Sequence, residues 1–324
     1  MSTTTLRGVA LAATLTAALA CSTNRTADSP RAQTPAAEVE SSADPGGSGA
    51  ALARVDGAAA GWASSGFAAS SHWDDGKAEV VRYAGTRSRY GQRRDFEMTV
   101  IHVKEEFDAA KLVKSDWPER AETLQVIKSN VVFSMPTENY PYNLSSGTFM
   151  RRDNPSSLVK LTTTSHEWCG ITTKNLDLRG DTPALKYRSY FESEGEGEFD
   201  LSEWPEGGVA EEQLVFAVRD LKFEEGLKVP VTVLSRQLES HARTPTWRPG
   251  ELVVVDTRTV KDAGGKDHEV WHVEARLGGD TLSYDVGVAA PHLLVRFDGT
   301  EGASMVLEEA TRWAYWDFSK PSPF

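Results

Sequence analysis

Cysteine is scarce in this chain, because its 324 residues include only Cys21 and Cys169. If Cys21 carries a lipid, as its context below indicates, Cys169 has no partner within the chain. An internal disulfide is then excluded, and the fold is expected to depend on its apolar core.

Several catalytic signatures are also missing, among them G-x-S-x-G, C-x-x-C, the Walker A motif and the Rossmann glycine pattern. These are common signals of serine hydrolases, thiol-based metal or redox sites and nucleotide binding. His268 and His272 are four residues apart and would share one face of a helix, but residues 270–273 read as a strand. We therefore expect no metal site and no cofactor.

Positive charge is in the minority, since 35 Lys and Arg against 47 Asp and Glu give a formal net charge of −12. Such a chain is poorly suited to nucleic acid, so no nucleic-acid partner is expected. The acidic segment 192–206 lacks the ligand spacing of an EF-hand, and we interpret it as a solvated linker rather than a calcium site.

Basic side chains gather in one hairpin loop. A solvated loop explains them most simply, and contact with phosphate or carboxylate groups of an envelope glycolipid is the alternative. The cluster consists of Arg82, Arg87, Arg89, Arg93 and Arg94.

Long apolar runs are equally rare, and the clearest one covers residues 8–20, between Arg7 and Cys21. A single positive charge, a short apolar stretch and small residues before a cysteine are typical of a signal peptide. The sequence Ala18-Leu19-Ala20-Cys21 resembles a lipobox. We expect removal of residues 1–20 and lipidation of Cys21, which would anchor the chain in a membrane. An ordinary secretory peptide is the alternative.

Residues 21–57 are rich in Ala, Ser, Thr, Pro and Gly, which predicts a flexible tether. Ser22 follows the anchor cysteine in place of an Asp-type retention signal, which favours the periplasmic face of the outer membrane if the cell has two membranes. The remaining chain divides into a β region at 58–200 and another at 201–324, or forms one continuous β domain.

Strand patterns dominate the region after the tether. Residues 78–83 and 96–103 are predicted to form the two arms of a hairpin, and Asp298-Gly299 predicts a second hairpin turn. Only residues 108–114 and 209–220 read as helices. Further strands are predicted at 126–133, 157–164, 229–234, 251–255, 269–275, 281–288, 292–297 and 304–310.

A family resemblance covers most of the chain after the tether. Segments 73–79, 89–91, 103–107 and 139–142, with the block Glu167-Trp168-Cys169-Gly170, resemble a family of uncharacterised exported bacterial lipoproteins. The part from Leu214 to Glu308 is similar to exported proteins of a domain of unknown function whose fold is a β-clam. The resemblance implies a mainly β fold with antiparallel curved sheets, of the β-clam or open-barrel type, and it implies no activity.

The strongest candidate for catalysis is Cys169, which is near His166 and Glu167. On an extended strand, alternation would place Cys169 and Glu167 on one face and His166 on the other. A nucleophilic thiol would therefore need a base from elsewhere, such as His72, His102 or His272. A cysteine beside tryptophan is more often a buried packing residue, which is the interpretation we favour.

Aromatic side chains are spread through the β segments, where they would fill a core or line a concave apolar site. The candidates for ligand contact are Trp73, Tyr90, Tyr140, Tyr142, Trp168 and Trp271.

Two functional hypotheses follow. The first is a membrane-anchored envelope lipoprotein, non-enzymatic, that binds an apolar or glycolipid ligand or serves a partner protein. The second is a thiol-dependent enzyme or hydrolase centred on Cys169. The first is favoured, because the second has none of the strong motifs.

Overall fold

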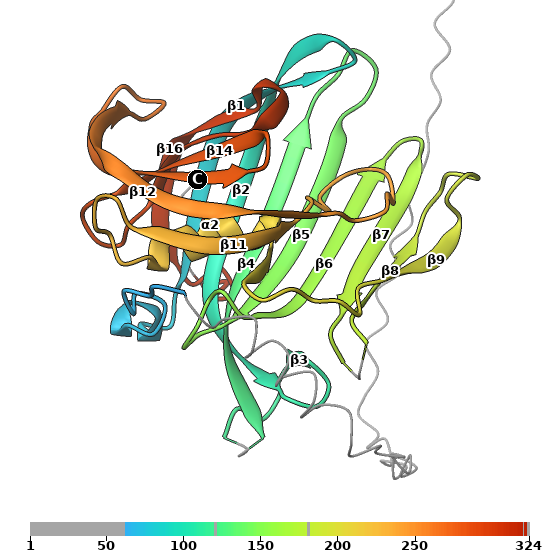
Figure 1. Cartoon of the computed structure of the whole chain (residues 1–324), viewed down its shortest axis with the longest axis horizontal. Coiled ribbons are helices and arrows are strands. Elements are labelled where there is room, and N and C mark those ends of the chain that lie inside the picture. The colour runs from blue at the N-terminus through green and yellow to red at the C-terminus, as the bar shows by residue number, and fades with distance from the viewer. Residues whose placement is uncertain (1–61, 120–121, 180–181, 320, 323–324) are drawn as a thin grey trace, which may run out of the picture. The chain divides into compact units, whose positions relative to one another are not determined.

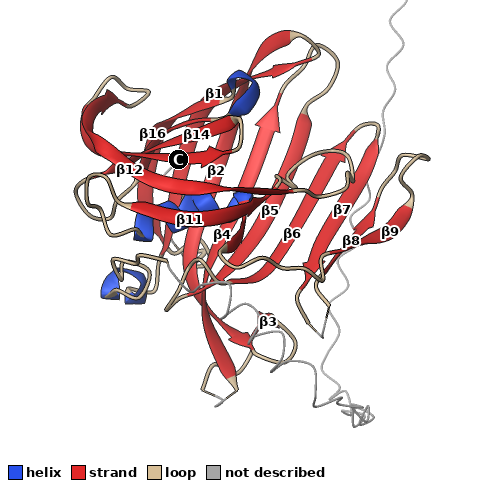
Figure 2. Ribbon diagram, in the orientation of Figure 1, coloured by secondary structure: helices blue, strands red, loops and turns tan. Residues whose placement is uncertain are grey.

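The computed structural model describes residues 62–119, 122–179, 182–319 and 321–322. The predicted signal peptide, Cys21 and the tether at 21–57 lie outside these residues. Strands dominate the described chain (Figure 1 and Figure 2). They are β1 (Ala78–Arg89), β2 (Gln92–Asp108), β3 (Val113–Lys114), β4 (Thr123–Met135), β5 (Tyr142–Arg151), β6 (Leu158–Glu167), β7 (Gly170–Asp177), β8 (Ala184–Arg188), β9 (Glu196–Asp200), β10 (Gly208–Ala210), β11 (Lys228–Leu234), β12 (Trp247–Lys261), β13 (Asp267–Leu277), β14 (Asp280–Gly287), β15 (Leu294–Asp298) and β16 (Ser304–Trp313).

Helical structure is limited to short turns. Within the part of the chain that the structure describes, these are η1 (Ser71–Asp74), η2 (Glu211–Gln213), α2 (Leu214–Ala217), η3 (Val218–Asp220) and η4 (Thr300–Gly302). No described helix has the length and apolar character needed to cross a bilayer.

The strands form one sheet in the order β10-β11-β12-β13-β14-β15-β16-β1-β2-β4-β5-β6-β7-β8-β9, with β3 paired to β2. Neighbours in this order are antiparallel except β10 and β11, which are parallel. The fold-class prediction, mainly β with antiparallel curved sheets, is confirmed. Strands of the two predicted regions occupy the two halves of this order and join where β16 pairs with β1.

The sheet curves until its ends face each other. Register shifts at Arg82/Tyr83 and Val254/Asp256 interrupt the ladders, and such bulges bend a strand and increase its twist. Leu161 and Leu176, from β6 and β7, share a buried cluster with Leu234 at the other end of the strand order. The interior is therefore enclosed between two halves of a single sheet.

The helix predicted at 209–220 is confirmed in part, because η2, α2 and η3 cover residues 211–220 while Val209 and Ala210 belong to strand β10. The helix predicted at 108–114 is wrong. There β2 continues to Asp108, whose carboxylate accepts hydrogen bonds from the backbone N–H groups of Ala110 and Lys111. Leu112 then adopts a left-handed conformation, with φ of 51°, and the chain turns back into β3. A turn closed by an Asp side chain replaces the helix.

The η2–α2–η3 segment packs inside the curve and is held there by a buried ion pair (Figure 1). Arg219 donates to both carboxylate oxygens of Glu79, on β1, at 2.6 and 3.1 Å. It also donates to the backbone carbonyls of His292 and Pro291, at 2.8 and 2.7 Å. Although burial raises the pKa of Glu79, the Arg219 guanidinium holds it well below its usual value. The pair fixes the segment that covers the candidate site.

Candidate ligand-binding site

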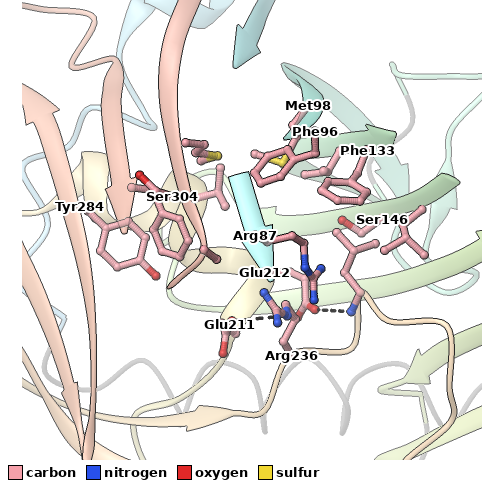
Figure 3. A pocket seen from close by; sticks show the side chains of 17 residues that line it. Arg87, Phe96, Met98, Phe133, Ser146, Glu211, Glu212, Arg236, Tyr284 and Ser304 are labelled. Carbon is pink, nitrogen blue, oxygen red and sulfur yellow. Dashed lines mark hydrogen bonds and ion pairs between the residues drawn. The ribbon is translucent and has the colours of Figure 1, made fainter. Parts of the chain in front are cut away.

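An apolar cavity lies between the sheet and the η2–α2 segment (Figure 3). We call it the inner cavity, and its free space is about 100 Å³. Strands β2, β4 and β5 supply one side, β14, β15 and β16 another, and α2 with the chain after β11 closes it. Its apolar lining consists of Phe96, Met98, Val131, Phe133, Leu144, Val215, Leu238, Tyr284, Phe297, Ala303 and Met305.

Strand alternation explains this lining. Along β2, Phe96 and Met98 point inward, while Glu97 between them is exposed. On β4, Val131 and Phe133 are buried and Val132 is 49% exposed. Since successive side chains of a strand face opposite sides of the sheet, adjacent strands of this pattern build a continuous apolar wall.

All charged residues of the lining gather at one side of the inner cavity together with Ser146, while Ser304 lies beside Tyr284 (Figure 3). We call this side the mouth, and it consists of Arg87, Ser146, Glu211, Glu212 and Arg236. In Figure 3 the Arg87 and Arg236 side chains point toward each other below Phe96 and Phe133. Burial and the positive charge of Arg236 lower the pKa of Arg87. Two cations thus face one another at the edge of an apolar space.

Glu212 is the most deeply buried charged group of the mouth, at 6% exposure. Its Oε1 accepts hydrogen bonds from the backbone N–H groups of Gln237 and Leu238, at 2.6 and 2.9 Å. Its Oε2 is buried without a protein partner. Burial, reinforced by the negative charge of Glu211, raises the pKa of Glu212.

The block at 167–170 forms a hairpin end. Glu167 pairs with Gly170, so Trp168 and Cys169 make the two-residue turn between β6 and β7. Cys169 is exposed, and the interpretation of it as a buried packing residue is wrong. A tight turn also replaces the extended strand on which the predicted alternation of these side chains depended. His166 is exposed, whereas Glu167 is buried and accepts a hydrogen bond from Ser165 at 3.3 Å.

Tyrosines, rather than a histidine, surround the thiol. Cys169 Sγ lies 3.0 Å from Tyr140 Oη, and the Trp168 ring stacks on Tyr140 at 5.9 Å between centroids. Hydroxyl contacts continue from Tyr140 to Tyr142 at 3.4 Å and from Tyr142 to Tyr90 at 2.7 Å. Five candidates named from the sequence, Cys169 among them, are thus neighbours, joined through loops and strand ends.

The three histidines considered as bases for Cys169 are engaged elsewhere. His102 is buried against Trp73 and Phe216, and burial lowers its pKa to about 3. His272 contacts Asp285 at 3.2 Å and Glu274 at 3.3 Å. His72 meets the Trp73 ring edge-to-face and lies 3.8 Å from Glu79. None of these contacts involves the thiol, so the described geometry offers Cys169 no histidine base.

The remaining aromatic candidates also lie apart from the inner cavity. Trp73 is fully buried among Phe67 and Phe216, and Trp271 stacks on Phe223 at 5.8 Å. None of the six aromatic candidates lines the inner cavity; its aromatic lining comes from Phe96, Phe133, Tyr284 and Phe297.

Residues 268–272 read His-Glu-Val-Trp-His, the spacing with which helical zinc proteases hold their metal. Here the segment lies on β13, where residues four apart are about 13 Å from each other along the strand. His268 instead contacts Asp262 at 2.8 Å. Among the described residues, no group of three or more His, Cys, Asp or Glu side chains could hold a metal ion.

Sequence reasoning missed most of the inner cavity. Phe96, Val131 and Phe133 lie in predicted strands, and their alternation is the signal that could have located one wall. β5 was not predicted, because its inward positions include Ser146 and the fully buried Thr148, which weaken the apolar pattern. Glu212 and Arg236 carry no motif, since only the fold brings their segments together.

No family model matches the chain, and no curated protein matches it. Among solved structures, the chain is similar to a beta-barrel-like protein of the domain of unknown function DUF1849 from Brucella abortus. It is 10% identical, with a TM-score of 0.41, and the match covers 73% of this chain and 98% of that protein. This likeness concerns the fold alone.

Proposed function

We propose that this chain is a non-enzymatic envelope lipoprotein whose β body binds the aliphatic chain of an amphiphile in the inner cavity. The observation that carries the proposal is the separation of character within the cavity. Most of its lining is apolar and aromatic, and its charged groups lie together at one side. Ligand sites commonly combine such an apolar lining with a few oriented polar groups.

The composition of the wall suits a flexible aliphatic chain. Met98 and Met305 are unbranched and polarisable, so they adapt to an irregular occupant. Phe96 and Phe133 pack against each other at 4.8 Å between centroids and form a stiff side of the space. Burying apolar surface there contributes about 25 cal/mol for each Å² removed from water.

The proposed address rests on the N-terminal sequence. A signal peptide at 1–20 followed by Cys21 would export the chain and attach lipid to the cysteine, with 21–57 as a tether. The resemblance to exported lipoproteins through the Glu167–Gly170 block supports the same address. A lipid anchor would keep the inner cavity close to membrane amphiphiles.

Thiol chemistry at Cys169 is the alternative function. The thiol is exposed, as an active nucleophile requires, but its neighbour is a tyrosine hydroxyl rather than a base of imidazole type. We therefore favour binding over catalysis.

Filling the inner cavity tests the proposal. Val215→Phe adds a ring to a half-buried position of its lining, while Val132→Phe places the same ring on the outer face of β4. The full chain with Cys21→Ser, which cannot be acylated, is titrated with the fluorescent probe N-phenyl-1-naphthylamine, and the probe is then displaced with dodecanol. We expect saturable, displaceable binding that Val215→Phe abolishes and Val132→Phe retains. Equal binding by both variants would overturn the proposal.

A further inference from the structure

A second, polar pocket adjoins the mouth of the inner cavity. Its free space is about 250 Å³, and it shares Glu211 and Arg236 with the inner cavity. Other residues around it include Lys174, Arg243 and Arg248. The two spaces together form one site with an apolar end and a charged end.

Cations outnumber anions around this joint site, although the whole chain carries a net charge of −12. The cations are Arg87, Lys174, Arg236, Arg243 and Arg248, and the carboxyl groups are those of Glu211, Glu212, Glu239 and Glu301.

The cations at the mouth are only partly neutralised by the protein. Arg236 lies 4.0 Å from Glu211 and 3.8 Å from Glu239, both longer than a hydrogen bond. Glu211 is already engaged by a short contact from Arg248. Arg87 contacts the Phe133 ring, and no described carboxylate pairs with it. Lys174 donates to the backbone carbonyls of Glu239 and His241 and forms no direct ion pair with a described carboxylate.

Some of the buried side-chain polar atoms that have no protein partner belong to residues around these two spaces. The Nε–H groups of Arg236 and Arg248 are buried without protein acceptors, and so is the hydroxyl of Ser146. A buried donor without an acceptor is costly, so such groups point to an absent partner. Arg236 borders both spaces, whereas Ser146 lines the inner cavity and Arg248 lines the polar pocket.

We infer that the amphiphile carries an anionic head group, a carboxylate or a phosphate, which lies at the junction and accepts hydrogen bonds from Arg236 while its chain occupies the inner cavity. Arg87 supplies a second positive charge from the opposite side. This inference rests on the proposed function, because the head group is located from the position of the ligand's aliphatic chain in the inner cavity. Guanidinium groups suit both anions, since they present paired N–H donors.

Ligands that share one aliphatic chain length and differ in head group separate the two contributions to binding affinity. The full chain with Cys21→Ser is titrated calorimetrically with dodecanol, dodecanoate, dodecyl phosphate and inorganic phosphate. We expect at least one anionic amphiphile to bind roughly tenfold or more tightly than dodecanol, as charge-assisted hydrogen bonds predict. A preference for dodecyl phosphate assigns a phosphate head, and the reverse assigns a carboxylate.

Matched variants locate the charge. Arg87→Gln removes a cation that has no ion pair within the described part of the chain. Combining it with Arg236→Gln should bring the anionic ligands to the affinity of dodecanol. Arg188→Gln is the control, because Arg188 lies on β8 outside both spaces and pairs only loosely with Glu196 at 3.4 Å.

The outcomes distinguish failure of the head-group inference from failure of the proposed function. If dodecanol and both anions bind wild type equally, the head-group inference fails and the proposed function stands. If no amphiphile binds, both fail. Inorganic phosphate binding as tightly as dodecyl phosphate would overturn the inference in favour of a free-anion site. Because these comparisons use the wild-type sequence at every cavity position, they remain decisive if the double variant does not fold.

Discussion

Replacing Arg219 with methionine should destabilise the fold strongly. Arg219 and Glu79 are each 1% exposed, and Arg219 makes four hydrogen bonds, two of them to the Glu79 carboxylate. Methionine fills a similar volume but leaves a buried carboxylate without its partner. Removing one member of such a pair costs about 3–5 kcal/mol. That is a large fraction of a typical unfolding free energy of roughly 5–15 kcal/mol.

Equilibrium urea unfolding at neutral pH, followed by tryptophan fluorescence, measures this loss. The double variant Glu79→Gln with Arg219→Met should be more stable than Arg219→Met alone, because no charge is then left buried. A loss below about 1 kcal/mol for Arg219→Met would refute the reasoning, since that is the range of an exposed pair.

The pH dependence of the folding stability is an independent test of the Glu79–Arg219 ion pair. The pKa of Glu79 is depressed in the folded chain relative to its usual value of 4.5, so its contribution is fully present above about pH 4.5 and is lost as the pH falls below it. Glu79→Gln should remove this acid-sensitive component. If acid unfolding of Glu79→Gln followed the wild-type profile, the ion pair would not be the source.

Three further predictions concern other groups. His102 has a usual pKa of 6.5 and a folded pKa of about 3, so wild type should lose stability as the pH falls from 6.5 toward 3. In urea unfolding over that range, the unfolding free energy of His102→Gln should fall less steeply with pH. Equal slopes would argue against a neutral, buried imidazole. The exposed Cys169 should react with a thiol reagent in the folded protein, and Cys169→Ser should change the unfolding free energy by less than about 0.5 kcal/mol; a protected thiol or a larger loss would contradict the turn position. Cys21→Ser should release the chain from the membrane fraction of the producing cells and remove the acyl mass from its N-terminal peptide, whereas an unchanged distribution would exclude a lipid anchor.

The strands were predicted well where the two faces of the sheet differ in polarity. β1, β2, β4 and β13 alternate or run β-branched, and their pairings follow that pattern. β5 escaped prediction because Ser146 and Thr148 occupy inward positions that usually hold apolar side chains. The helix predicted at 108–114 failed for a local reason, since the Asp108 side chain closes a turn instead.

The candidate site was less accessible to sequence reasoning. The alternation along β2 and β4 predicts that Phe96, Met98 and Phe133 form one wall of the inner cavity. The mouth, however, depends on contacts between segments that are distant in the sequence. Glu212 and Arg236 belong to η2 and to the chain after β11, and neither lies in a recognisable motif. Conversely, two histidines spaced like His268 and His272 can bind one zinc ion only when the backbone is helical. On the extended strand β13 they lie too far apart.

The most direct test of the account is a native mass spectrum of the full chain carrying Cys21→Ser after equilibration with dodecanoate. One non-covalently bound amphiphile for each chain is predicted for this protein and for its Val132→Phe variant, and none for Val215→Phe. An adduct of equal intensity on the Val215→Phe variant, or no adduct on any of the three, would contradict the claim that the inner cavity holds an aliphatic chain.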